Sequence, residues 1–364
     1  MPEYAPTLGA LTIRDGTRAD RDAVADLFER AEPEIPLTRA AFGDMWEWLH
    51  WGNPVRPSDV LVGADADGTL DGHVAMLPVM FRAGGEPLLA GWPCELMVDE
   101  HQRKSLLYPA LVQKLLRLCT THGYAFAYAL INRPRVLKAN IALGLRPLGE
   151  VPVWARPYRP SSIAHEMLGG ARGRAAALLA APANVVCGML GPRVPRGIAL
   201  QEVTRFDTEI EPLFATTLHA AYRYVAERTA ASLNWRFFGL PARGYRAFVA
   251  RSGGRIAGYV AFRTMPMRAF TALGIADLWH DPAVPAAGTA LLAAVDRAAR
   301  EEQVDLAACL MPRGSPMASL LRRHWFFASP ESFTLTVYQP RRDLPYGAST
   351  LADWHPTWYD HDYV

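Results

Sequence analysis

Two carboxylates lie in apolar surroundings where they could move a proton. Glu95 follows Pro93 within the apolar run GWPCELMVDE (91–100), and such a carboxylate is suited to accept a proton near neutral pH. Asp277 lies in the apolar run GIADLW, where a buried aspartate needs either a partner or a function. As alternatives, Glu95 would be a strand residue paired with an arginine, and Asp277 a structural carboxylate whose partners are all internal.

A basic turn, HQRKS (101–105), stands directly before the amphipathic segment LLYPALVQKLLRLC (106–119). The free N–H groups and the dipole of a helix N-terminus attract anions. The turn therefore predicts a phosphate-binding site. Its candidate residues are Gln102, Arg103, Lys104 and Ser105. A solvated basic turn without a ligand is the alternative interpretation.

A third cluster, LNWRFFGLPARGY (233–245), combines aromatic and basic residues. Arg236 beside Trp235 could clamp a carboxylate or stack on a ring, with Tyr245 nearby in the sequence. These three residues are candidates for binding a substrate. The alternative places Trp235 in the core and Arg236 in a structural ion pair.

Composition limits the functions that these residues can serve. The chain has 364 residues, which predicts two domains, and its net charge of +2 does not require nucleic acid or a membrane as a partner. The 4 cysteines lie far apart without metal-ligand spacing, so we expect a reduced, cytoplasmic chain with no metal. The first residues, MPEYAPTLGALTI, lack the pattern of a secretion signal.

The elements that position these residues alternate between strands and helices. A strand at 11–15, helices at 19–31 and 39–51, and three strands lead to the helix at 106–119; a strand at 124–131, a helix and a final strand follow. The same order returns after residue 197, which predicts a mixed α/β fold used twice. The predicted parts are domains at 1–160 and 197–342, a linker at 161–196 and a tail at 343–364.

The linker contains the most apolar window of the chain, 175–190, interrupted by Pro182 and Asn184. It falls short of the roughly 20 residues that a membrane span needs. We expect a helical linker packed on a domain surface. A segment that lies on a membrane surface is the alternative.

The order of elements from Trp92 to Gly144 resembles the acyl-donor half of the GNAT superfamily of N-acyltransferases. The run around Trp235 and Arg236, and the chain end DWHPTWYDHDYV (353–364), resemble a bacterial "WRF" tandem-GNAT group related to the Fem-like transferases. The resemblance implies two GNAT-like acyl-CoA N-acyltransferase domains in tandem. It also implies acetyl-CoA or another acyl-CoA as co-substrate and a small-molecule amine as acceptor.

Residue roles follow from the same resemblance. Glu95 would be the general base, Asp277 would orient or deprotonate the acceptor amine, and Asn132 matches an asparagine that often follows this strand. Backbone groups of Leu96, Met97 and Val98 would face the donor where two parallel strands part near Pro93.

The chain departs from the family at two places. The family's pyrophosphate loop has the pattern Gln/Arg-x-x-Gly-x-Gly/Ala. Laid on residues 103–108, it has Leu106 and Tyr108 at the small positions; shifted by one residue to 102–107, it has lost both glycines as well. Asn140 stands where relatives carry a tyrosine acid. Two alternatives therefore stay open: an aminoacyl-tRNA-dependent transferase of the Fem type, and a non-catalytic GNAT-fold binding protein.

Overall fold

The computed structural model describes residues 11–267, 269–340 and 349–361. The chain divides into two compact units, the first formed by the residues up to Gly149 with Thr334–Thr350, the second by Glu150–Phe333 with the residues from Leu351 on. The expectations for residues 1–10, and for much of the predicted tail at 343–348 and 362–364, lie outside the described residues.

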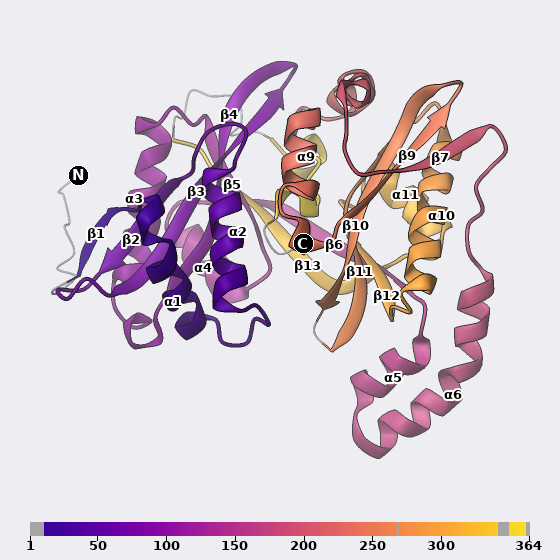
Figure 1. Cartoon of the computed structure of the whole chain (residues 1–364), viewed down its shortest axis with the longest axis horizontal. Coiled ribbons are helices and arrows are strands. Elements are labelled where there is room, and N and C mark those ends of the chain that lie inside the picture. Colours follow the sequence, from indigo (N-terminus) through magenta and orange to yellow (C-terminus); the bar gives the residue numbers. More distant parts are fainter. Residues whose placement is uncertain (1–10, 268, 341–348, 362–364) are drawn as a thin grey trace. The chain divides into compact units, whose positions relative to one another are not determined.

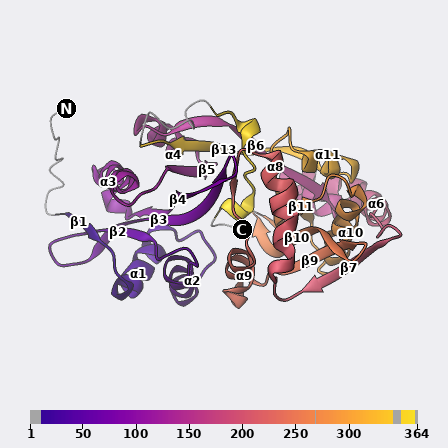
Figure 2. The same cartoon turned by 90° about the horizontal axis from the view of Figure 1, so that it is seen from above.

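The first unit is a sheet with helices on both faces (Figures 1 and 2). Its strands follow the order β1-β2-β3-β4-β5, antiparallel except for the parallel pair β4–β5. Its elements are β1 (Thr12–Asp15), α1 (Arg21–Ala31), α2 (Arg39–Trp51), β2 (Asp59–Ala64), β3 (Leu70–Ala83), β4 (Glu86–Val98), α3 (Leu107–Thr121), β5 (Phe126–Ile131) and α4 (Pro134–Ala142), followed by the start of β6 (Arg146–Pro157).

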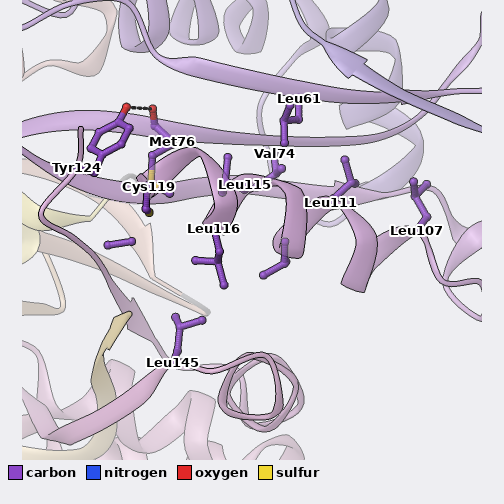
Figure 3. Packing of buried hydrophobic residues seen from close by; sticks show 12 residues of the cluster. Leu61, Val74, Met76, Leu107, Leu111, Leu115, Leu116, Cys119, Tyr124 and Leu145 are labelled. Atoms are coloured by element: carbon purple, nitrogen blue, oxygen red, sulfur yellow. Dashed lines mark hydrogen bonds between the residues drawn. The ribbon is translucent and has the colours of Figure 1, made fainter. Parts of the chain in front are cut away.

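Alternation along β3 separates the two faces of this sheet. Val74 and Met76 pack in the cluster under α3, with Leu107, Leu111 and Leu115 of that helix (Figure 3). Because successive side chains of a strand point to opposite faces, His73 is directed away from α3, and it bonds to Trp46 of α2. The leucines recur every four residues, which gives α3 its single apolar face.

The second unit repeats this plan. Its sheet has the order β6-β12-β11-β10-β9-β7, with β11–β12 parallel and the other pairs antiparallel. Its elements are α5 (Pro160–Leu168), α6 (Gly170–Met189), β7 (Ile198–Val203), α7 (Glu211–Leu213), α8 (His219–Ala221), β8 (Tyr224–Ala226), α9 (Ala230–Phe238), β9 (Arg246–Ser252), β10 (Arg255–Met267), β11 (Phe270–His280), α10 (Pro285–Glu301), β12 (Leu306–Leu310), α11 (Pro316–Arg323) and β13 (Phe327–Tyr338).

The two halves of the chain exchange their last strands. Val153–Pro157 of β6 pair with β12 in the second unit, whereas Thr334–Tyr338 of β13 pair with β5 in the first. The mixed α/β fold predicted from the sequence is confirmed. The predicted domains were each continuous in the sequence and did not include this exchange.

A helical hairpin occupies the predicted linker. Figure 1 shows α5 and α6 side by side. The Asn184 side-chain amide donates to Ser161 Oγ at 2.7 Å, and its carbonyl oxygen accepts from the Ser161 backbone N–H at 3.1 Å. These bonds fix which face of α6 is directed toward α5.

Candidate active site

Two neighbouring parallel strands part in the first unit. In the described residues, β4 and β5 share two register pairs, Ala90 with Phe126 and Gly91 with Ala127. From Tyr128 on, β5 continues its pairing with β13, while β4 continues along β3 to Val98. The ladder thus ends two residues before Pro93, where the sequence predicted a parting.

A bulge on β4 follows at Glu95 and Leu96. His73 pairs with Met97 and Ala75 with Cys94, so Val74 of β3 lies opposite two residues of β4. The bulge is therefore two residues beyond Pro93, which itself pairs with Met76. Glu95 has a φ of 50°, a left-handed conformation that is uncommon for a residue other than glycine. Such strained positions cluster at functional sites.

The Glu95 carboxylate is enclosed and only half hydrogen-bonded. Its side chain is 5% exposed, and Oε2 lies 2.8 Å from His50 Nε2. Among the described residues, Oε1 has no hydrogen-bond partner. A buried oxygen without a partner is costly unless a ligand or water completes it. The carboxylate thus has one buried oxygen, Oε1, whose hydrogen-bonding capacity is unused in the described chain.

His50 connects Glu95 to Ser58. Its Nδ1 lies 3.0 Å from Ser58 Oγ, and the imidazole is fully buried. Because a carboxylate oxygen accepts, Nε2–H donates to Glu95, and Nδ1 is left to form a hydrogen bond with the serine hydroxyl. The arrangement holds the carboxylate in one orientation.

His73 hydrogen-bonds to the backbone at the bulge. Trp46 Nε1–H donates to His73 Nε2 at 3.0 Å, so the ring proton is on Nδ1, which donates to the Glu95 carbonyl oxygen at 2.8 Å. Burial lowers the pKa of His73 to about 4. A neutral imidazole therefore holds the backbone of Glu95 at neutral pH.

Nothing in the sequence indicated that these residues lie together. Trp46 and His50 lie four apart on α2, which puts them on one helix face, but nothing in the sequence connects that face to β3 or β4. His50, His73 and Glu95 also lie close enough to share a cation. Both nitrogens of His73 are already engaged, which fits a hydrogen-bonded frame.

The predicted phosphate-binding turn is partly tied to the protein itself. Gln102 Nε2 donates to Asp71 Oδ2 at 3.2 Å, and Arg103 Nη2 donates to the Ala31 carbonyl at the end of α1 at 2.8 Å. Ser105 Oγ accepts from the Leu107 N–H at 3.1 Å, whereas Lys104 is exposed. Arg103 and Lys104 are both exposed, and one nitrogen of Arg103 is engaged by the Ala31 carbonyl.

Tyr108 joins the start of α3 to α4. Its hydroxyl donates to Asn140 Oδ1 at 2.7 Å, and burial raises its pKa to about 12, so it stays protonated at neutral pH. The residue that replaces a small loop residue thus contacts the residue that replaces the family's tyrosine.

The other donor-site candidates are distributed around the parted strands. Met97 is buried, while Leu96 and Val98 are partly buried and pack against the cluster under α3. Asn132 is exposed after β5, one position before Arg133, the residue that precedes α4. We infer that any contact of Leu96 and Val98 with a donor would use their backbone.

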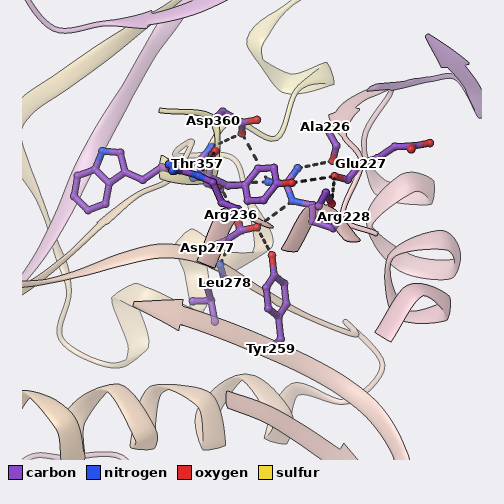
Figure 4. Close-up of polar contacts among 12 residues, drawn as sticks. Ala226, Glu227, Arg228, Arg236, Tyr259, Asp277, Leu278, Thr357 and Asp360 are labelled. Carbon is purple, nitrogen blue, oxygen red and sulfur yellow. Dashed lines mark hydrogen bonds and ion pairs between the residues drawn. The ribbon is translucent and has the colours of Figure 1, made fainter. Parts of the chain in front are cut away.

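Asp277 belongs to a buried network in the second unit (Figure 4). Its Oδ2 accepts from Arg228 Nε at 3.0 Å and from the Tyr259 hydroxyl; its Oδ1 accepts from Thr357 Oγ1 at 3.0 Å and from the Leu278 N–H at 3.2 Å. Four donors occupy both carboxylate oxygens. Burial by itself would raise the pKa of Asp277, but attraction to Arg228 and the hydrogen bonds from Arg228 and Tyr259 help to outweigh it, so the pKa is lowered. We infer a structural role.

The aromatic and basic cluster of the second unit holds the chain end. Arg236 is 1% exposed and donates to the carbonyls of Tyr359 at 3.2 Å, Trp358 at 3.1 Å and His361. Tyr245 packs edge-on against Phe237 with ring centroids 5.1 Å apart. Trp235 is half-buried on α9. The structure thus brings together the two motifs, at 233–245 and 353–364, that the sequence singled out separately.

One family model matches part of the first unit. Residues 12–132 match the family model described as an acetyltransferase (GNAT) domain. A search of curated protein sequences finds no match to this chain. The first unit therefore carries a GNAT-superfamily acetyltransferase domain.

Solved structures share the fold over nearly the whole chain. A conserved protein of Enterococcus faecalis, described as a probable N-acyltransferase, is 13% identical with a TM-score of 0.62, covering 90% of this chain and 72% of that one. A GCN5-related N-acetyltransferase of Anabaena variabilis is 12% identical with a TM-score of 0.61, covering 90% and 72%. Saccharomyces cerevisiae N-myristoyltransferase with bound myristoyl-CoA is 12% identical with a TM-score of 0.63, covering 93% and 81%.

Proposed function

We propose that the protein is an N-acyltransferase that moves an acyl group from an acyl-CoA thioester to the amine of a small-molecule acceptor. The observation that carries the proposal is the parting of β4 and β5 beside Glu95, whose Oε1 has no partner in the described chain. Backbone groups freed from the ladder can bind an amide-containing arm, and the free oxygen can accept an amine proton. The GNAT family model and the myristoyl-CoA-bound neighbour support acyl-CoA as the donor.

The proposed reaction needs one proton transfer at the carboxylate. Glu95 Oε1 takes the proton of the acceptor amine as the nitrogen attacks the thioester carbonyl. The C–S bond then breaks, and the thiolate leaves with a proton from solvent or from a nearby hydroxyl. His50 keeps Oε2 occupied, so that Oε1 is the oxygen that reacts.

The second unit has a different part in this proposal. The same order of elements occurs in both halves, and this repeat supports a tandem of two GNAT-like domains. Unlike Glu95, Asp277 has both oxygens occupied, so we place the chemistry in the first unit. The grouping with "WRF" and Fem-like proteins remains a proposal that rests on the sequence motifs.

Donor binding tests the first half of the proposal. We expect CoA and acetyl-CoA to raise the melting temperature, because a ligand that binds the native state stabilises it. Aminoacyl-tRNA serves as the second arm of the measurement. A shift with aminoacyl-tRNA alone would favour the Fem-type alternative, and no shift with any donor would favour a non-catalytic binding protein.

Turnover tests the second half. With a panel of amines and acetyl-CoA, release of free thiol measures the reaction. We expect Glu95→Gln to lower kcat by roughly 10²- to 10⁴-fold while CoA still raises the melting temperature, because the substitution removes the proton acceptor and keeps the shape. The matched control is Glu86→Gln, the same change at an exposed position of β4. Normal turnover in Glu95→Gln would refute the base assignment.

A further inference from the structure

One face of α6 is apolar and faces solvent. Its members recur at helical spacing: Leu178, Leu179, Pro182, Val185, Val186 and Met189. Leu179 is 85% exposed and Met189 78%. This spacing is normally that of a core-facing stripe. The sequence predicted a linker packed on a domain surface; the structure instead leaves the apolar face of the helix uncovered.

The opposite face of α6 is already used. A Cβ on Gly173 would lie 2.4 Å from the His165 carbonyl oxygen of α5, so the helices approach closely there. Asn184 bonds to Ser161 on the same side. Because α5 takes the small and polar side of α6, the apolar side is directed outward. We call this outward side the apolar face.

The concentration of exposed apolar groups in this hairpin is unusual. Large exposed patches of this kind mark interaction sites. Nine of the thirteen large hydrophobic side chains that are exposed in the described chain lie between residues 167 and 194: Met167, Leu168, Leu178, Leu179, Val185, Val186, Met189, Leu190 and Val194. The remaining four are scattered over other elements.

The charged residues at both ends of the apolar face indicate which kind of surface can cover it. Arg172 and Arg174 precede it, Arg193 and Arg196 follow it, and all four are exposed. No charged residue lies between 175 and 192, and Glu166 is the one acid between 160 and 198. Since both ends are basic, pairing two copies in either direction would bring arginines against arginines. An anionic surface matches both ends at once.

We propose that the apolar face docks on an anionic lipid surface. Leu178, Leu179, Val186 and Met189 would enter the boundary between headgroups and acyl chains, while the flanking arginines contact lipid phosphates. The helix would lie in the plane of the surface, because no helix in the described chain is long and apolar enough to cross a membrane. Pro182, on the exposed side, leaves the α5 contacts intact.

Vesicle flotation with the full chain tests the proposal. The probes are vesicles of phosphatidylcholine alone and of phosphatidylcholine mixed with phosphatidylglycerol. We expect binding to the mixed vesicles, falling as salt rises, and weak binding to phosphatidylcholine alone. The double variant Leu179→Glu/Val186→Glu should lose more than about tenfold in binding, because it places two charges in the apolar boundary.

Two further variants keep the test decisive. Arg172→Gln/Arg174→Gln leaves the apolar residues in place and should lower binding about fivefold for each arginine. Phe327→Glu is the matched control, because it changes an exposed apolar residue of β13 outside the hairpin and should bind normally. Unchanged thermal melting of each variant shows that it is folded.

Three results would overturn the proposal. The first is absence of flotation with mixed vesicles. The second is flotation that both hairpin variants retain, which would assign binding to another surface. The third is a concentration-dependent dimer in sedimentation that Leu179→Glu/Val186→Glu abolishes, without vesicle binding, which would make a second copy the occupant.

Discussion

At Glu95, backbone geometry and side-chain chemistry depend on each other. The bulge gives the residue its positive φ and directs its carboxylate to the α2 side of the sheet, toward His50. The bond from His73 to the Glu95 carbonyl compensates the ladder bond that the bulge removes. Strain at one residue is thus maintained by two buried histidines on other elements.

His50 is expected to act as a positioning residue. In His50→Leu, we expect kcat to fall by up to roughly 10²-fold while KM for the donor stays constant, because the carboxylate loses its orienting donor. Steady-state kinetics measures both constants.

His122→Leu is the control for this measurement. It makes the same substitution at a half-exposed histidine that pairs with Asp59. If His50→Leu changes kcat no more than His122→Leu, His50 has a purely structural role.

His73 should make folding sensitive to acid. Its pKa is about 4 in the folded chain against the ordinary histidine value of 6.5, so below pH 6.5 the unfolded chain binds a proton that the folded chain does not. Stability should therefore fall as pH drops from about 6.5 to about 4, by about 3 kcal/mol in all from this group. Above pH 6.5 the group contributes no slope.

Melting temperature followed across this window measures the effect. His355, whose pKa burial lowers to about 3, adds a similar slope in the second unit. We therefore expect His73→Leu to flatten the dependence without removing it. An identical slope in His73→Leu would show that His73 does not titrate as proposed.

At the scale of elements, a bulky side chain in the first turn of α3 is expected to limit how closely a phosphate approaches the N–H groups of that turn. The ring of Tyr108, in the first turn of α3, is held by Asn140 and packs against the cluster under α3. Because helical side chains tilt toward the N-terminus, we expect this ring to be close to the position where phosphates would bind. The first turn of α3 therefore differs from a glycine-lined anion site. A donor must displace this ring or avoid it.

Two substitutions separate these possibilities. Tyr108→Phe removes the bond to Asn140 and should cost about 1 kcal/mol of stability. Tyr108→Ala also removes the ring and should bind CoA more tightly than Tyr108→Phe, as measured by calorimetry. Equal affinities in the two variants would mean that the ring does not obstruct the donor.

Local signals predicted most elements of the first unit. Periodicity predicted α2 at 39–51, as observed. It predicted a helix at 106–119, and the ends of the observed α3 lie within two residues of these bounds. Pro93 predicted the parting of β4 and β5, yet the bulge itself formed at Glu95 and Leu96. His50, Ser58 and His73 could not be joined to Glu95 in advance, because their contacts depend on which face of the sheet α2 covers.

At the scale of the molecule, strand exchange makes the first unit depend on the end of the chain. All six residues of β5 are buried, and five of them pair with Thr334–Tyr338 of β13. No local pattern in the sequence indicates this partner, since about 200 residues separate the two strands. The repeated order of elements alone suggests two self-sufficient domains.

A fragment of residues 1–149 should therefore fail to fold alone. Without β13, the buried strand β5 would expose backbone N–H and C=O groups along one edge, which favours aggregation. We expect insoluble protein or no cooperative thermal transition. Co-expression with residues 150–364, which supply Thr334–Tyr338, is the matched control and should restore solubility. A soluble fragment 1–149 that melts cooperatively and binds CoA would show that the first unit folds without the exchanged strand.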